Sequence, residues 1–162
     1  MVVRKILFNG NPLLRKVSKP IKAITPEIRK LVEDMIETMY VNQGAGLAAV
    51  QIGELKRLIV IDVSEKKDQP LVLINPKIVA KVKEEIGKEA CLSVPGLEGK
   101  VSRFQQVRVK ARNLHFIDVE VDAEGYFAVA IQHEVDHLDG ILYIDRVETG
   151  SLKPSREDDD EQ

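Results

Sequence analysis

The sequence predicts an α+β fold in which antiparallel β-sheets pack around a central buried helix, with an amphipathic helix near the N-terminus. Three observations lead to this prediction. Apolar residues show helical spacing near the start of the chain and again near its end, and several short strand patterns lie between. With 162 residues, of which 44% are hydrophobic, the chain can bury one substantial core. We therefore expect a single domain over residues 1–150.

The first helix is predicted from Pro26 to Val41. Thr25, Pro26 and Glu27 form a typical helix start, because proline fits the first helical position and threonine the capping position before it. Apolar residues then recur at helical spacing, at Ile28, Leu31, Val32, Met35, Ile36 and Met39. This spacing indicates an amphipathic helix with one buried face.

The middle of the chain predicts strands. Residues 58–63 and 71–75 are short aliphatic runs, while Ile78, Ala80 and Val82 alternate with lysines. Residues 107–111 and 116–121 alternate in the same way. Alternation with a period of two is typical of antiparallel strands that bury one face, so we predict antiparallel pairing between the two helices.

The second helix is predicted over residues 124–139, where helical spacing returns before Gly140. It carries the sequence His-Glu-Val-Asp-His from His133 to His137. Side chains four positions apart lie on one face of a helix, so the two histidines can bind one metal ion, with Glu134 beside it. The rest of the segment is apolar nearly all round, which predicts burial, and buried imidazoles need polar partners.

The histidine spacing alone does not establish a metal site. Short His/Glu patterns also arise by chance on ordinary helices, although two of the only three histidines fall at ligand spacing here. A mononuclear catalytic site needs a third protein ligand and an open position for water. The candidates are His115 in a predicted turn, a distant carboxylate, and Cys91, the only cysteine. A lone cysteine is usually a small buried apolar residue.

The charge of the chain is small and unevenly distributed. The net charge is −2, and five consecutive acids from Glu157 to Glu161 leave the rest of the chain slightly basic. We expect residues 151–162 to form a polar, acidic, disordered tail. A small net charge with few aromatic residues gives no nucleic-acid-binding surface. No apolar run approaches the ~18 residues of a membrane span and no targeting sequence is evident, so we expect a cytoplasmic protein without a membrane partner.

Three segments resemble, in order, the motifs of peptide deformylases. The first, from Gly44 to Gln51, is similar to the glycine-rich motif of that family. The second, residues 89–93, is similar to its cysteine motif, and the third, residues 132–140, is similar to its metal-binding helix. The likeness extends from about Ile6 to Arg146 and so covers nearly the whole predicted domain.

The resemblance implies hydrolysis of the N-formyl group from N-formylmethionine at the amino terminus of nascent proteins, with release of formate. Metal-bound water or hydroxide would be the nucleophile, and Glu134 would be the general acid and base. The side-chain amide of Gln51 and the backbone N–H of Leu92 would stabilise the developing oxyanion. The ligands of the single divalent metal ion would be Cys91, His133 and His137.

The resemblance also implies where the substrate binds. Glycines let a strand-like backbone approach the peptide, and an apolar pocket would take its first side chain, although pocket candidates could instead be ordinary core residues. The candidates are Gly44, Ala45, Gly46, Tyr126, Val129 and Ala130. Glu89 would either orient a ligand histidine or lie on the surface as an ordinary carboxylate. For Arg103 we expect a structural ion pair.

The metal and the partners are less closely defined. One cysteine with two histidines suits zinc, nickel, cobalt or iron, and the resemblance implies Fe(II). Several family members end in a basic helix that helps them meet the ribosome, whereas this chain ends in acids, so we do not expect that kind of docking. A metalloprotease would need a further histidine or glutamate ligand after His137. A non-catalytic protein with a structural metal would need a fourth ligand near Cys91.

Overall fold

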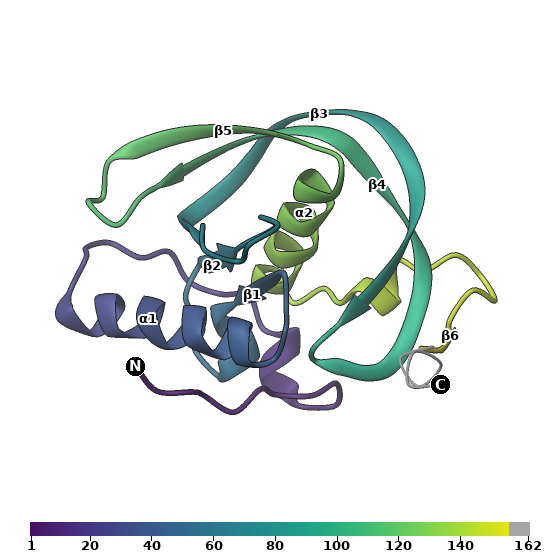
Figure 1. Ribbon diagram of the computed structural model, residues 1–162, viewed down its shortest axis with the longest axis horizontal. Coiled ribbons are helices and arrows are strands. Elements are labelled where there is room, and N and C mark those ends of the chain that lie inside the picture. The colour runs from purple at the N-terminus through teal and green to yellow at the C-terminus, as the bar shows by residue number, and fades with distance from the viewer. Residues whose placement is uncertain (156–162) are drawn as a thin grey trace.

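The computed structural model describes residues 1–155 and confirms the predicted fold class (Figure 1). Within these residues, antiparallel strands form one bent sheet in the order β1-β2-β3-β4-β5, and β6 pairs with β4. The strands are β1 (Gly46–Ala48), β2 (Leu58–Ile61), β3 (Leu71–Cys91), β4 (Val94–Arg112), β5 (Asp118–Glu124) and β6 (Lys153–Pro154). The α-helices are α1 (Pro26–Val41) and α2 (Tyr126–Leu138). Three 3-10 helices are η1 (Pro12–Arg15), η2 (Ala49–Ile52) and η3 (Tyr143–Asp145).

β3 and β4 are much longer than the short strands that we predicted. They form a single hairpin that turns at Leu92 and Ser93. Three shifts in their register interrupt the pairing, and irregularities of this kind bend strands. The hairpin, together with β5, therefore arches over α2 (Figure 1). Residues 79–88 are exposed on both faces of β3, and residues 84–88 lack the alternation by which a strand is recognised.

Two helices cover opposite faces of β2, and the alternation along this strand explains how. Ile59 and Ile61 belong to the apolar cluster that contains the buried face of α2, whereas Leu58 and Val60 belong to the cluster that contains α1. All four side chains are at most 1% exposed. The short aliphatic run in the sequence is thus a strand buried on both faces.

α1 has the predicted bounds and the predicted start. The side-chain oxygen of Thr25 accepts a hydrogen bond of 3.2 Å from the backbone N–H of Ile28, and Pro26 occupies the first helical position. The buried face of α1 consists mainly of Ile28, Leu31, Val32, Met35 and Met39. These side chains pack on β1 and β2, which fixes the segment that follows α1 relative to the sheet.

α2 lies inside the curve of the sheet and is buried as predicted. Ala128, Ile131 and Leu138 are fully buried in its apolar contacts. The helix is followed by Gly140, whose φ of +74° lies in the left-handed region that favours glycine. A Cβ atom at this position would lie 2.5 Å from the backbone oxygen of Arg15, so η1 packs directly against the end of α2.

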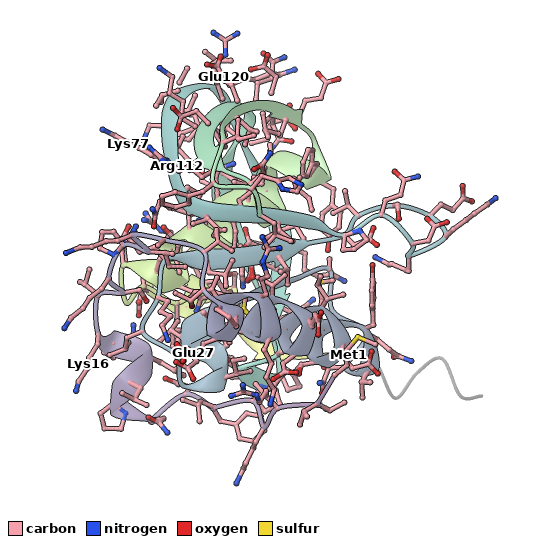
Figure 2. All side chains as sticks on the ribbon, turned by 90° about the vertical axis from the view of Figure 1, so that its left-hand side faces the viewer. Met1, Lys16, Glu27, Lys77, Arg112 and Glu120 are labelled. Atoms are coloured by element: carbon pink, nitrogen blue, oxygen red, sulfur yellow. The ribbon has the colours of Figure 1, made fainter. Side chains whose placement is uncertain are left out.

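The outer strands β4 and β5 carry a ladder of opposite charges. The register places Arg108 opposite Asp122 and Arg112 opposite Asp118, with N–O distances of 2.8 and 3.2 Å. Figure 2 shows Arg112 and Glu120 projecting from the same end of the molecule. Opposite charges that face each other across neighbouring strands stabilise their pairing.

The C-terminal part of the chain returns to β4. Lys153 and Pro154 form β6 beside Glu98 and Leu97. Residues 156–162, which include the predicted acidic run, lie outside the described residues. Among residues 1–155, no helix has both the length and the apolar composition that crossing a membrane would require.

Candidate metal centre

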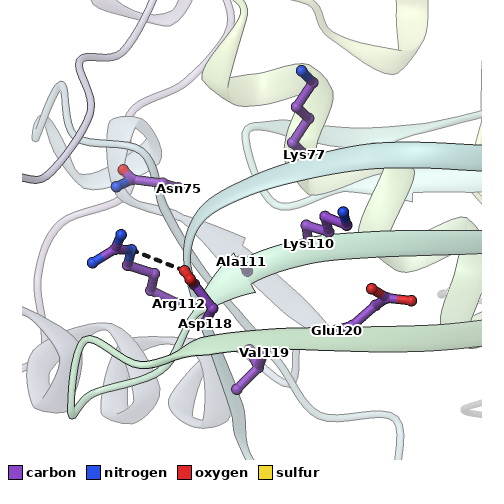
Figure 3. A pocket seen from close by; sticks show the side chains of 8 residues that line it. All are labelled: Asn75, Lys77, Lys110, Ala111, Arg112, Asp118, Val119 and Glu120. Carbon is purple, nitrogen blue, oxygen red and sulfur yellow. Dashed lines mark ion pairs between the residues drawn. The ribbon is translucent and has the colours of Figure 1, made fainter.

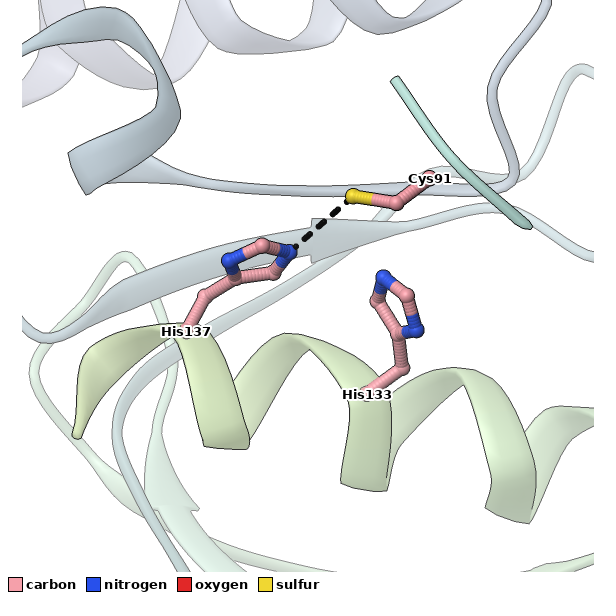
Figure 4. Close-up of side chains that lie close together, drawn as sticks. All are labelled: Cys91, His133 and His137. Carbon is pink, nitrogen blue, oxygen red and sulfur yellow. Dashed lines mark hydrogen bonds between the residues drawn. The ribbon is translucent and has the colours of Figure 1, made fainter. Parts of the chain in front are cut away.

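The structure brings Cys91, His133 and His137 together, although they are far apart in the sequence. Cys91 is the last residue of β3, and the two histidines project from neighbouring turns of α2 (Figure 4). One ligand atom from each residue can be chosen so that all three lie within 4.8 Å of one another. The sulfur of Cys91 is 3.3 Å from Nε2 of His137. The two imidazole centroids are 5.1 Å apart.

This group fits a single divalent metal ion. A thiolate and two imidazoles are common ligands of zinc and of iron, and three protein ligands leave a position open for water. His137 is completely buried, and within residues 1–155 its Nδ1 has no hydrogen-bond partner. A buried ring nitrogen without a partner is costly, and a metal bound by Nε2, the nitrogen beside Cys91, offsets that cost. His115 is exposed in the turn after β4, so it does not belong to the group.

Glu89 and Arg103 form a buried pair behind His133. The Glu89 carboxylate lies 2.8 Å from Nδ1 of His133. Arg103 donates two hydrogen bonds to the same carboxylate, of 2.8 and 3.0 Å. Burial alone would raise the pKa of Glu89, but the hydrogen bonds from His133 and Arg103 outweigh it and lower the pKa to about 2. Glu89 therefore stays ionised and accepts a hydrogen bond from the Nδ1–H group of the imidazole.

Glu134 lies between the two histidines and is 3% exposed. Its Oε1 is 3.9 Å from Nε2 of His133 and 4.0 Å from Nε2 of His137. Its Oε2 is buried without a hydrogen-bond partner among the described residues. Burial raises the pKa of Glu134 to about 7. A carboxylate with a free oxygen at this place can exchange a proton with a molecule bound beside the histidines.

The side-chain amide of Gln51 is fixed at both ends. Its oxygen accepts a hydrogen bond of 2.9 Å from the backbone N–H of Ala48, and its nitrogen donates to the hydroxyl of Ser93 at 3.0 Å. The same nitrogen lies 3.6 Å from the sulfur of Cys91. Leu92 follows Cys91 in the hairpin turn. η2 thus presents an amide N–H group beside the metal ligands.

The predicted substrate-binding residues lie in different environments. Gly44 comes so close to Leu92 that a Cβ atom would lie 2.9 Å from the leucine side chain, and a Cβ atom on Gly46 would lie 2.9 Å from Glu134. Ala45 and Val129 are partly buried, whereas Tyr126 is 65% exposed. Ala130 is buried in the apolar cluster around α2. The glycines therefore lie directly against the site, and Ala130 takes part in core packing.

Sequence reasoning missed three residues that contact this region. Ser93 holds the Gln51 amide, while Asp136 binds both Arg103 and Arg146. Asp136 carried a usable signal, because a carboxylate on a helix predicted to be buried needs a cation as partner. Arg146 carried none, since its local sequence resembles that of an ordinary surface segment.

A separate hollow lies where β3, β4 and β5 run side by side (Figure 3). Charged side chains of both signs surround it, including Lys77, Lys110, Arg112, Asp118 and Glu120. Arg112 and Asp118 pair with each other across it. None of the lining residues belongs to the metal group or contacts it, so this hollow is not part of the candidate site.

Fold and site together define a class of enzyme. Two histidines four positions apart on a buried helix, a cysteine at a hairpin turn and a buried glutamate beside them are the features of a mononuclear metal-dependent hydrolase. Residues 3–153 match the family model described as polypeptide deformylase. The chain belongs to this family, and its activity is that of a peptide deformylase, which removes an N-formyl group.

Individual relatives agree with the family match. The chain is 50% identical over 147 residues to a peptide deformylase of Lachnoclostridium phytofermentans. The aligned residues cover 91% of this chain and 90% of that one. It is 48% identical over 148 residues to one of Carboxydothermus hydrogenoformans, with 91% and 95% covered. The crystal structure of peptide deformylase from Thermotoga maritima superposes with a TM-score of 0.87 at 40% identity, covering 91% of this chain and 99% of that one.

Proposed function

We propose that the chain removes the formyl group from N-formylmethionine at the amino terminus of nascent proteins, with Glu134 as general acid and base. One observation carries this assignment: Glu134 is buried beside two imidazoles, with one carboxylate oxygen free of hydrogen bonds among the described residues. Glu134 takes a proton from the attacking water and later delivers it to the departing amine. Formate and a free amino terminus are the products.

Cys91, His133 and His137 are the proposed ligands of one divalent metal ion. When bound, the ion supplies a Lewis acid that lowers the pKa of water and polarises the formyl oxygen. For its identity we propose Fe(II), with zinc, nickel and cobalt as ions that the same ligands also suit. Anaerobic purification followed by metal analysis and a formate assay tests this choice.

Gln51 and Leu92 are the proposed oxyanion donors. The contacts of Gln51 with Ala48 and Ser93 hold its amide in one orientation before the substrate arrives. A donor fixed in advance stabilises developing negative charge without the cost of reorganisation. The backbone N–H of Leu92, one residue after Cys91, acts with it.

The peptide is proposed to bind along β1. This strand is the first in the sheet order, so within the described residues only β2 pairs with it and one edge is open to an extended peptide. Gly44, Ala45 and Gly46 bring the peptide backbone close to Glu134. Tyr126, Val129 and Ala130 are the proposed contacts of the methionine side chain, with Tyr126 at the exposed rim.

The wider setting follows from the substrate. Nascent formylated chains are made in the cytoplasm, and we place the enzyme there. Residues 1–150 act as one catalytic domain, since the family match spans residues 3–153 and the metal ligands come from both β3 and α2.

The proposal is tested with the Glu134→Gln variant. It is expected to bind metal as the parent does and to lose at least about a hundredfold in formate release from an N-formylmethionyl peptide. A metal-loaded variant with parental turnover would contradict the assignment of Glu134. The Cys91→Ala variant is expected to lose the metal, and an active Cys91→Ala protein that keeps its metal would contradict the ligand set.

A further inference from the structure

We propose that Asp136 and Arg146 are positioning residues for the metal ligand His133. They act at a distance, through Arg103 and Glu89, as the outer half of a chain of alternating charges. The inference rests on the proposed function only in taking His133 as a ligand. It concerns two further residues, which contact neither the metal-binding atoms of the ligands nor the proposed peptide-binding site along β1.

The inner half of this series of charges, Glu89 and Arg103, fixes the His133 imidazole. Glu89 lies 2.8 Å from Nδ1 of His133 and accepts a hydrogen bond from its N–H, which leaves Nε2 with a free lone pair for a metal. Arg103 holds both oxygens of Glu89, at 2.8 and 3.0 Å. The direction in which Glu89 points is therefore set by the guanidinium of Arg103.

The outer half fixes that guanidinium. Arg103 uses its remaining terminal nitrogen to donate to Oδ2 of Asp136 at 2.6 Å. Arg146 binds the same carboxylate from the other side with two hydrogen bonds, of 2.7 Å to Oδ2 and 3.0 Å to Oδ1. Two-point contact between arginine and a carboxylate sets orientation as well as distance. Asp136 is thus locked between two arginines.

Charge balance makes Arg146 necessary. Glu89, Arg103 and Asp136 are each at most 9% exposed and together carry one net negative charge. Arg146, with 46% of its side chain exposed, supplies the fourth charge, so that the four side chains together are neutral. Without it, two buried carboxylates compete for Arg103, and a buried charge without compensation is costly. The expected response is a shift of Arg103 toward Asp136, which loosens its hold on Glu89.

The segment that carries Arg146 is itself held in place. η3 immediately precedes it, and the backbone N–H of Arg146 donates to the carbonyl of Tyr143 at 2.9 Å. The Tyr143 ring stacks on the His133 ring with centroids 6.0 Å apart. Arg15 of η1 pairs with Asp145. One short segment thus contacts His133 directly through Tyr143 and indirectly through Arg146.

The test compares Arg146→Met with Arg108→Met as a matched control. Arg108 is also about half exposed and also pairs with carboxylates, but it lies in the ladder between β4 and β5. The zinc dissociation constant of each protein is measured by competition with a chelator of known affinity. We expect Arg146→Met to raise it about tenfold, at the lower end of the effect of removing a partner of a metal ligand. Arg108→Met is expected to stay within about twofold.

Further readouts separate positioning from general destabilisation. In the cobalt-loaded protein, the visible absorption bands should shift in Arg146→Met and not in Arg108→Met, because they report ligand geometry. Arg146→Lys, which keeps the charge without the two-point contact, should bind zinc with intermediate affinity. Unchanged zinc affinity and an unchanged cobalt spectrum in Arg146→Met would overturn the inference. Should Arg146→Met fail to fold, the zinc affinity and cobalt spectrum of Arg146→Lys decide in the same way.

The His133→Ala variant keeps this result distinct from the proposed function. If His133→Ala loses zinc and Arg146→Met does not weaken it, the ligand assignment stands and only the positioning role is wrong. If His133→Ala binds zinc as the parent does, the ligand assignment itself is wrong and the positioning role falls with it.

Discussion

The backbone of Gly46 lies directly against the side chain of Glu134. A Cβ atom added to Gly46 would come within 2.9 Å of Cγ and 3.1 Å of Oε2 of the glutamate. Gly46→Ala should therefore displace the Glu134 carboxylate and lower kcat by about 10- to 100-fold, since small misplacements of a reacting group have effects of this size. Metal content should not change. Formate release and metal analysis of the same preparation check this prediction.

Gly87→Ala is the control for this substitution. No atom of the described residues comes within 4 Å of a Cβ at Gly87, apart from its neighbours in the chain, and Gly87 is an exposed position in β3. We expect its kcat to stay within about twofold of the parent. Equal activity of the two alanine variants would show that the approach of Gly46 to Glu134 has no catalytic consequence.

Replacing Gln51 by Met tests the oxyanion donor. Loss of one such donor typically costs ~3 kcal/mol, or roughly a hundredfold in kcat. Ser93→Ala removes only the group that accepts the Gln51 hydrogen bond at 3.0 Å, so its kcat should fall less. Steady-state kinetics on an N-formylmethionyl peptide distinguish the two. A Gln51→Met enzyme with more than half the parental kcat would remove Gln51 from the mechanism.

The Asp62 carboxylate should make the free energy of unfolding depend on pH in the acid range. Burial alone would raise its pKa, but hydrogen bonds from Ser64, from the Tyr40 hydroxyl and from the backbone of Gln69 outweigh it and lower the pKa to about 2. A carboxylate whose pKa is lower in the folded state stabilises the fold above its unfolded pKa, about 4. This contribution, on the order of 2–3 kcal/mol, should be lost as pH falls from about 4 to about 2.

Denaturant unfolding between pH 5 and pH 2 checks this for the parent and Asp62→Asn. The free energies of unfolding of the two proteins should converge as the pH falls through this window. Asp118→Asn, at a carboxylate that is 87% exposed, controls for the change in net charge. A constant difference between parent and Asp62→Asn across the window would rule out the linkage.

Two glycines with similar backbones test the contact between η1 and the end of α2. Gly140 and Gly150 have φ of +74° and +78°, so alanine is strained at both. Only at Gly140 would the added Cβ meet the backbone of Arg15, at 2.5 Å. Gly140→Ala should lower the free energy of unfolding by about 1–3 kcal/mol more than Gly150→Ala, the usual cost of a forced shift in packing. Similar melting temperatures of the two variants would contradict this.

Local sequence was sufficient to predict the features that depend on a single helix or strand. Thr25 and Pro26 mark the start of α1 because capping involves only neighbouring residues. His133 and His137 share a face because the helix itself places them there. The same holds for the burial of α2, which follows from a segment that is apolar nearly all round.

Local sequence did not predict the features that depend on residues far away in the sequence. Residues 84–88 form strand because β4 pairs with them, not because their exposed side chains alternate. The partners of Asp136 come from β4 and from the segment after η3, so no spacing in the sequence predicts that Arg103 and Arg146 meet there. Cys91 was one of three candidates for the third ligand, and only the family resemblance selected it, since a lone cysteine is usually a small core residue.

The position of Cys91 at the tip of the long hairpin also bears on how long the folded enzyme survives. Cys91 and His137 are 46 positions apart in the chain, and an ion that binds both closes the intervening segment into a loop. The ligands meet only when the hairpin tip rests on α2, so the ion binds the folded chain and stabilises it over the unfolded one. Release of the ion should therefore precede global unfolding, so a chelator is expected to shorten the lifetime of the native protein as well as to stop its chemistry.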